Sequence, residues 1–137
     1  MSEQVVTWLG DDAGHLQFEG VTSYGDPVSI GGDSGGRGAK PSDLLPVSLA
    51  ACIAYDVVTI LKKQRQDLRG LRIAISSEQD PDPPWTFRRI TLRFQIEGDV
   101  DERKARKANE LSETKYCAVS AAVRPTVDVR TEIEVAR

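Results

Sequence analysis

The first thirty residues follow a pattern of apolar and polar positions that predicts β-strands. The segments "EQVVTWLG" and "GHLQFEGV" are rich in strand-forming residues, and the turn cluster "DDAG" separates them. A third, shorter strand is predicted at "DPVSIGG". The next stretch contains five glycines and no apolar residue larger than alanine, which is typical of a flexible loop. We therefore expect strands within 3–30 and a glycine-rich loop at 31–41.

The pattern then changes to a run that is apolar on nearly every side of a helix. Ser42 and Asp43 suit the first turn of a helix, and "KKQRQ" places cations at the C-terminal end of its dipole. We predict a helix over 42–66, in which Pro46 would cause a kink or a later start. A helix that is apolar all round needs cover that this chain can hardly supply, so a second copy of the chain is the expected cover.

The remaining residues predict a hairpin, further helices and a last strand. In the hairpin at 69–98 the turn "DPDPP" joins two alternating segments, the second of which places four large apolar residues on one face: Ile90, Leu92, Phe94 and Ile96. Helices are predicted over 101–124, solvated at first, with Asp99 or Asp101 as the cap, and more apolar later. A final strand is predicted at 126–135. This order of elements indicates the α+β class.

Length and composition limit the type of protein. A chain of 137 residues is long enough for one well-buried core, so we expect a single domain over 1–137. Only 6% of the residues are aromatic, which predicts an aliphatic core. The net charge of -3 argues against nucleic acid or anionic lipid as a partner.

Two further observations bear on where the protein acts. The apolar run of the predicted central helix approaches the length of a membrane span, but Pro46, Asp56 and the many alanines make insertion costly, so no membrane partner is expected. The N-terminal segment has no basic region followed by a long apolar run, which argues against a secretion signal. We expect a cytoplasmic protein.

The glycine-rich loop contains "GDSGG", which is similar to the nucleophile segment of trypsin-like serine proteases. The sole histidine, His15, lies 19 residues before Ser34. The two-barrel protease fold needs far more chain between base and nucleophile, and a longer chain overall. The motif is therefore interpreted as part of a flexible loop.

Phosphate and metal sites are also not expected. In "GGRGAK" the lysine does not follow a glycine directly and no hydroxyl residue follows it, unlike in a phosphate-binding loop. Two cysteines 65 residues apart and one remote histidine supply at most three zinc ligands, none of them closely spaced. We assign no metal.

The two cysteines, Cys52 and Cys117, are the remaining candidates for chemistry. Each could be a small apolar core residue, as free cysteines often are. A reactive thiolate would need a nearby cation, a helix N-terminus or a base. Asp56 lies one helical turn after Cys52 and would disfavour the thiolate. Any activating cation must come from elsewhere, and the sequence leaves several candidates that it cannot place: Arg37, Lys40, Lys115 and Arg124.

Three segments together, "KPSDLLPVSLAACIAYDVVTILKKQRQDLRGLRI", "EQDPDPPWTFRRITLRFQIEGD" and "ANELSETKYCAVSAAVRPTVDV", resemble the OsmC/Ohr family, and within it the OsmC-like subgroup. The match covers about residues 40 to 135. The resemblance implies an α+β, OsmC-like fold with antiparallel sheets around a long buried cysteine-bearing helix. It also implies an intertwined homodimer, in agreement with the cover that the apolar helix requires.

The resemblance further implies thiol-dependent reduction of organic hydroperoxides, the work of a peroxidase-type oxidoreductase in the response to oxidative stress. Cys52 matches the peroxidatic cysteine, which becomes a sulfenic acid, and Cys117 matches the resolving cysteine, which condenses with it to a disulfide. The implied partners are a small-molecule hydroperoxide and an external thiol reductant. No metal or organic cofactor is implied.

The sequence departs from the family pattern in the residues that activate the thiol. Active members also use an arginine in the N-terminal strands and a glutamate at the start of the cysteine helix. Here no arginine precedes Arg37, and Asp43 approximates the carboxylate. Lys115, Arg37 and Arg124 are candidate replacements for the cation. The alternative function is therefore a non-catalytic dimer that binds a small apolar or electrophilic ligand at a cleft beside Cys52.

Overall fold

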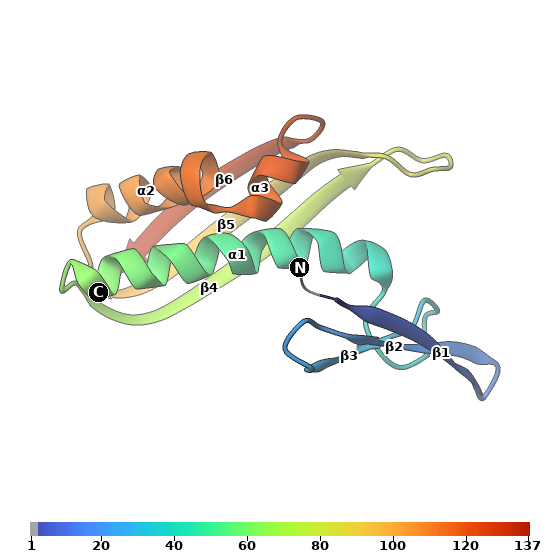
Figure 1. Cartoon of the computed structure of the whole chain (residues 1–137). Coiled ribbons are helices and arrows are strands. Elements are labelled where there is room, and N and C mark those ends of the chain that lie inside the picture. Colours follow the sequence, from blue (N-terminus) through green and yellow to red (C-terminus); the bar gives the residue numbers. More distant parts are fainter. Residues whose placement is uncertain (1–2) are drawn as a thin grey trace. The chain divides into compact units, whose positions relative to one another are not determined.

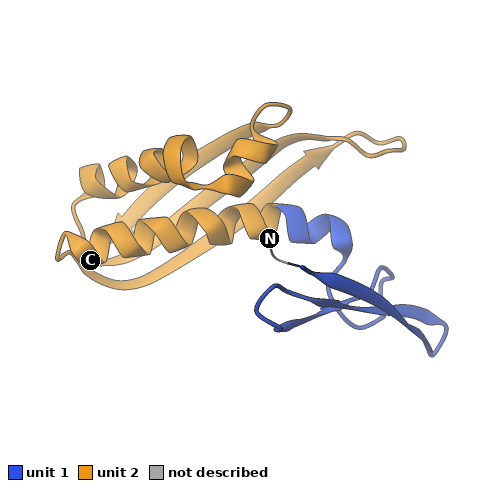
Figure 2. Cartoon of the chain, viewed as in Figure 1, with its two compact units in different colours: residues 1–45 blue, residues 46–137 orange. Residues whose placement is uncertain are grey.

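The computed structural model describes residues 3–137 and divides into two compact units. The first ends at Leu45, and the second runs from Pro46 to Arg137 (Figure 2). The elements mix helices and strands, as the α+β prediction requires. The candidate chemistry of the two cysteines lies in the second unit.

The first unit is an antiparallel sheet in the order β1-β2-β3, followed by the glycine-rich loop. Its strands are β1 (Val5–Asp12), β2 (His15–Val21) and β3 (Pro27–Ile30), which confirms three strands within residues 3–30. The turn between β1 and β2 has φ of +52° at Ala13 and +85° at Gly14, the left-handed conformation that a tight hairpin turn uses.

The long helix α1 (Pro41–Lys63) begins in the first unit and lies mostly in the second. It starts at Pro41 and continues through Pro46, so the proline does not delay its start. It ends three residues before the predicted 66, because the chain reverses at Arg65, whose φ is +56°. Among residues 3–137, α1 alone is long and apolar enough to cross a membrane, a test that core helices of soluble proteins also pass.

The second unit contains a three-stranded sheet in the order β4-β5-β6. β4 (Asp67–Gln79) and β5 (Phe87–Asp99) form the predicted hairpin. β6 (Asp128–Ala136), however, runs parallel to β5. The prediction of purely antiparallel sheets is therefore wrong here: helices connect β5 to β6, and such a crossover returns the chain to the start of the neighbouring strand, in the same direction.

Helices cover one face of this sheet (Figure 1). They are α1, α2 (Glu102–Leu111) and α3 (Ala118–Val123). Asp101 caps α2, as its side chain accepts a hydrogen bond of 2.8 Å from the N–H of Arg103. The predicted continuous helical region at 101–124 is interrupted by one wide turn of π-helix, η1 (Ser112–Tyr116).

The core of the second unit lies between α1 and the sheet. Its central side chains from α1 recur every four residues, and those from β5 every two, as expected for a helix packed on a strand. All are at most 1% exposed: Leu49, Ile53, Val57, Leu61, Ile90, Leu92, Phe94 and Ile96. This packing fixes the face of α1 that carries Cys52 relative to the helices that follow β5.

Candidate functional site

The fold brings the two cysteines together, although 65 residues separate them. Cys52 lies on α1 and is partly exposed, whereas Cys117 lies between η1 and α3 and is only 3% exposed. Burial, and after it a hydrogen bond with the Cys52 side chain, raise the pKa of the Cys117 thiol from 9.0 to about 11. The two thiols are thus direct neighbours with different environments.

The backbone on both sides of Cys117 is held by hydrogen bonds. Its N–H donates to the carbonyl of Ser112 at 2.8 Å, which closes the π-helical turn. Its backbone is extended and it caps α3, with Sγ accepting a hydrogen bond of 3.2 Å from the N–H of Ser120. This hydrogen bond lowers the pKa of Cys117, which is the opposite of the effect of burial. The position of the sulfur is therefore set by the turn itself.

Ser112 also connects this turn to the helix of Cys52. Its hydroxyl donates a hydrogen bond of 2.7 Å to Oδ2 of Asp56, which lies on α1 one turn after Cys52. Ser112 is fully buried. A short bond between a hydroxyl and a carboxylate in such a place is stronger than one in water. One serine thus contacts both elements that carry the cysteines.

A second group of polar contacts holds the turn against β6 and α3. The carboxylate of Glu113 accepts a hydrogen bond of 2.6 Å from Thr131 and forms an ion pair of 3.0 Å with Arg124. Its backbone carbonyl accepts a hydrogen bond of 3.0 Å from the hydroxyl of Ser120. The Glu113 side chain is only 12% exposed. These contacts surround the turn that ends at Cys117.

Sequence reasoning did not single out Ser112, Glu113 or Ser120. All three lie within the helical region predicted at 101–124, and the two serines are fully buried. A buried polar residue needs a partner, so Ser120 on the more apolar segment could have raised the question. The partners of Ser112 and Glu113, which are Asp56 on α1 and Thr131 on β6, cannot be found without the fold.

The cations predicted to support the thiols have other partners. Arg124 pairs with Glu113, and the Lys115 ammonium lies 5.6 Å from the centre of the exposed Tyr116 ring. Arg37 belongs to the first unit, where its Nε lies 3.7 Å from Asp12. The groups that shift the pKa of Cys117 besides burial are the Cys52 side chain and the backbone of Ser120 and Val119. Within the second unit, Arg124 and Lys115 thus contact groups other than the two thiols.

The predicted carboxylate, Asp43, is exposed in the first turn of α1, where its N–H donates to the carbonyl of Lys40 at 2.9 Å. In the glycine-rich loop Asp33 lies 3.5 Å from Nδ1 of His15. Over the described part of the chain, no group of three or more His, Cys, Asp or Glu side chains is arranged to hold a metal ion. The cysteine pair remains the candidate site.

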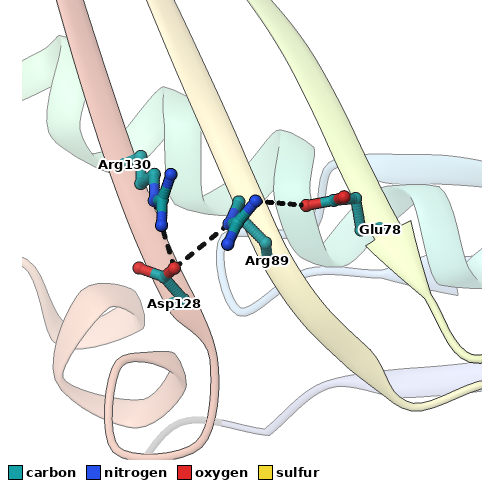
Figure 3. A network of polar contacts seen from close by, with 4 residues as sticks. All are labelled: Glu78, Arg89, Asp128 and Arg130. Carbon is teal, nitrogen blue, oxygen red and sulfur yellow. Dashed lines mark hydrogen bonds and ion pairs between the residues drawn. The ribbon is translucent and has the colours of Figure 1, made fainter.

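The exposed face of the β4-β5-β6 sheet carries a separate network of charges (Figure 3). Arg89 contacts Glu78 and Asp128, and Arg130 contacts the same oxygen of Asp128, each at 3.1 Å. The arginines hold the pKa of Asp128 below its ordinary value. Because these charges compensate one another and the group includes no nucleophile, we do not assign the chemistry to this face.

These features define a mixed α+β protein with a pair of neighbouring thiols, and comparisons with known proteins give its family. A family profile described as OsmC-like protein matches residues 31–132. Protein YhfA of Escherichia coli K12 is 31% identical over 121 residues, which cover 88% of this chain and 90% of YhfA. The chain belongs to the OsmC-like family.

Solved structures agree with this assignment. A hypothetical protein from Aquifex aeolicus VF5 has a TM-score of 0.83 and 29% identity, and the match covers 99% of this chain and 98% of that protein. The organic hydroperoxide resistance protein OhrB of Bacillus subtilis has a TM-score of 0.59 and 24% identity, with 96% and 98% covered. The latter similarity shows the fold alone.

Proposed function

We propose that this protein reduces organic hydroperoxides, with Cys52 as the attacking thiol and Cys117 as the resolving thiol. The observation that carries the proposal is the contact between two thiols of unequal environment. Cys52 is partly exposed, so a small molecule can reach it. Cys117 is buried and, with a pKa of about 11, stays protonated at neutral pH. Cys52 is therefore suited to react with the hydroperoxide, and Cys117 is suited to react with the sulfenic acid that forms on Cys52.

The proposed reaction has three steps. The Cys52 thiolate attacks the terminal peroxide oxygen, the O–O bond breaks, and the alkoxide takes a proton to leave as an alcohol. The Cys117 sulfur then attacks the Cys52 sulfenic acid, forming the disulfide and releasing water. An external thiol compound supplies two electrons and two protons to restore both thiols and is itself oxidised to a disulfide.

Family membership supports a redox role. OhrB of Bacillus subtilis, which shares the fold, is described as an organic hydroperoxide resistance protein. The sequence segments around both cysteines resemble those of the same family. We infer a small-molecule hydroperoxide as substrate and a thiol reductant as partner, in the cytoplasm.

The test adds less than one equivalent of cumene hydroperoxide to the fully reduced, folded protein, followed by intact mass measurement without reductant. The expected product has lost two hydrogen atoms, and digestion maps the link to Cys52 and Cys117. Cys52→Ser should show no reaction, and Cys117→Ser should accumulate a Cys52 sulfenic or sulfinic acid. Unchanged peroxide consumption by Cys52→Ser would refute the mechanism.

We also propose that the working form is a homodimer. In the second unit, α1 exposes an apolar stripe that includes Val47, 50% exposed, and Tyr55, 75% exposed. In the first unit, β1 exposes Val6 at 67% and Trp8 at 60%. Large apolar side chains exposed on both units are costly in water, and a second copy of the chain is the cover that we propose.

A second candidate function rests on the missing arginine. Residues 1–36 contain no arginine, Arg124 pairs with Glu113, and the Lys115 ammonium lies against the Tyr116 ring. A thiol without an activating cation could hold an electrophilic or apolar ligand beside Cys52 without turnover. Steady consumption of hydroperoxide with a thiol reductant would eliminate this alternative, whereas stoichiometric labelling of Cys52 without turnover would favour it.

A further inference from the structure

Ser112 is hydrogen-bonded to both elements that carry the cysteines. Its hydroxyl donates at 2.7 Å to Asp56, one turn from Cys52, and its carbonyl accepts at 2.8 Å from the N–H of Cys117. The bond to Asp56 joins α1 to the η1 turn. A disulfide requires Cα atoms within about 4.4 to 6.8 Å, so the distance between these elements decides whether it can form.

We propose that Asp56 and Ser112 are a positioning pair, whose hydrogen bond keeps Cys117 within bonding reach of Cys52. The inference rests on the proposed function, since it names residues that would make the resolving step efficient. The Asp56–Ser112 bond raises the effective concentration of one thiol beside the other. It matters most after the first oxidation, when a slow resolving thiol leaves the sulfenic acid exposed to a second peroxide.

The hydrogen bond with Ser112 also gives a reason for the presence of the Asp56 carboxylate close to Cys52. Asp56 lies four residues after Cys52, on the same face of α1. The Ser112 hydroxyl is directed at Oδ2 of that carboxylate at 2.7 Å, and Ser112 is fully buried. The carboxylate at this position is therefore the acceptor that connects α1 to the turn before Cys117.

The chain offers a matched control in the same turn. Thr114 donates a hydrogen bond of the same length, 2.7 Å, from its hydroxyl to the carbonyl of Glu110. Thr114 and Glu110 are both exposed and both lie on the α2–η1 segment, so this bond does not reach α1. Thr114→Ala removes a hydroxyl and a hydrogen bond from η1 but leaves the connection to α1 intact.

The test measures how readily the disulfide forms, independently of peroxide. Full-length protein is equilibrated with mixtures of reduced and oxidised glutathione, and the fraction with a Cys52–Cys117 disulfide is read by intact mass. In Ser112→Ala and Asp56→Ala the equilibrium constant for the disulfide should fall about tenfold, which is about 30 mV in reduction potential. Asp56→Asn keeps an acceptor and should stay close to wild type, as should Thr114→Ala.

The double variant Ser112→Ala/Asp56→Ala should show the same shift as either single variant, because all three lack one and the same bond. Additive shifts, or a shift in Ser112→Ala without one in Asp56→Ala, would overturn the pairing. Equal shifts in Thr114→Ala and Ser112→Ala would also overturn it, since general loosening of η1 would then be the cause. A thermal unfolding curve for each variant checks that the variant is folded at the temperature of the glutathione experiment.

A second measurement separates this inference from the proposed function. Each variant is treated with excess cumene hydroperoxide, and the ratio of disulfide to Cys52 sulfinic acid is measured. The positioning pair predicts more sulfinic acid in Ser112→Ala and Asp56→Ala than in Asp56→Asn and Thr114→Ala. If wild type forms the disulfide with glutathione but does not react with the hydroperoxide, the proposed function fails while the positioning pair stands. If all variants match wild type in both measurements, the positioning pair fails alone.

Discussion

Arg124 forms an ion pair of 3.0 Å with Glu113, four residues before Cys117, and the carboxylate that it meets is only 12% exposed. This pair connects Arg124 to the turn that precedes Cys117. We therefore expect that Arg124 stabilises the fold and does not activate a thiol.

Arg124→Gln should therefore lower the free energy of unfolding and leave the alkylation rate of Cys52 near that of wild type. We expect a loss of about 1–2 kcal/mol, because a mostly buried carboxylate loses its charged partner and keeps only its hydrogen bond from Thr131. Urea unfolding and iodoacetamide kinetics measure the two effects. Arg130→Gln, which removes an ion pair on the exposed sheet face, is the control and should unfold close to wild type. A large drop in Cys52 reactivity in Arg124→Gln alone would contradict the structural role.

The pH at which Cys117 becomes reactive is a second prediction. Because burial and the Cys52 side chain raise its pKa to about 11, alkylation of Cys117 in the folded protein should be slow at pH 9.0 and increase toward pH 11. In the unfolded protein the same cysteine should already react at pH 9.0. Mass mapping of alkylated peptides over a pH series measures both rates. Equal rates in folded and unfolded protein at pH 9.0 would show that the thiol is not buried.

The same shift predicts how stability changes in alkaline solution. Since the pKa in the folded state is higher than the ordinary 9.0, the unfolded state loses its proton first as the pH rises. The contribution of Cys117 to stability is thus complete below pH 9.0 and is lost as the pH rises to about 11. The free energy of unfolding, measured in urea, should fall more steeply across this window for wild type than for Cys117→Ala, because alanine does not titrate. The same pH dependence of stability in both proteins would show that titration of Cys117 is not coupled to folding.

Ile53 tests the packing under the cysteine helix. It is fully buried one residue after Cys52. Ile53→Ala should lower the free energy of unfolding by about 2–5 kcal/mol, and Ile53→Val by about 0.5–1.5 kcal/mol, because the cost follows the volume removed from a packed core. Denaturant unfolding measures the series. Similar small losses in both variants would mean that this side of α1 is not tightly packed.

Tyr55 tests the proposed homodimer. Its side chain is 75% exposed on α1, in the stripe that a second copy would cover. Tyr55→Glu should convert a dimer to monomers, because a buried unpaired carboxylate is costly at an apolar interface. Sedimentation velocity measures the change, and Lys104→Glu on the exposed face of α2 is the control. A dimer that survives Tyr55→Glu would exclude this stripe from the interface.

Local pattern accounts for most of the elements. The alternation of Ile90, Leu92, Phe94 and Ile96 with polar residues predicted the buried and exposed faces of β5, because successive side chains of a strand point to opposite sides. The glycine-rich loop and the start of α1 also follow from local preferences. The direction of β6 does not, since strand alternation is identical in parallel and antiparallel pairs, and the prediction was wrong there.

The sequence by itself determined the order of the elements and both candidate thiols, because periodicity, turn residues and the rarity of cysteine are local properties of the chain. Only the tertiary structure decided that Cys117 is buried beside Cys52, that Arg124 forms an ion pair with Glu113, and that Ser112 donates a hydrogen bond to Asp56. Each of these depends on which segments pack together over dozens of residues. Burial and hydrogen bonding, which set the protonation and position of a side chain, arise only when the chain has folded.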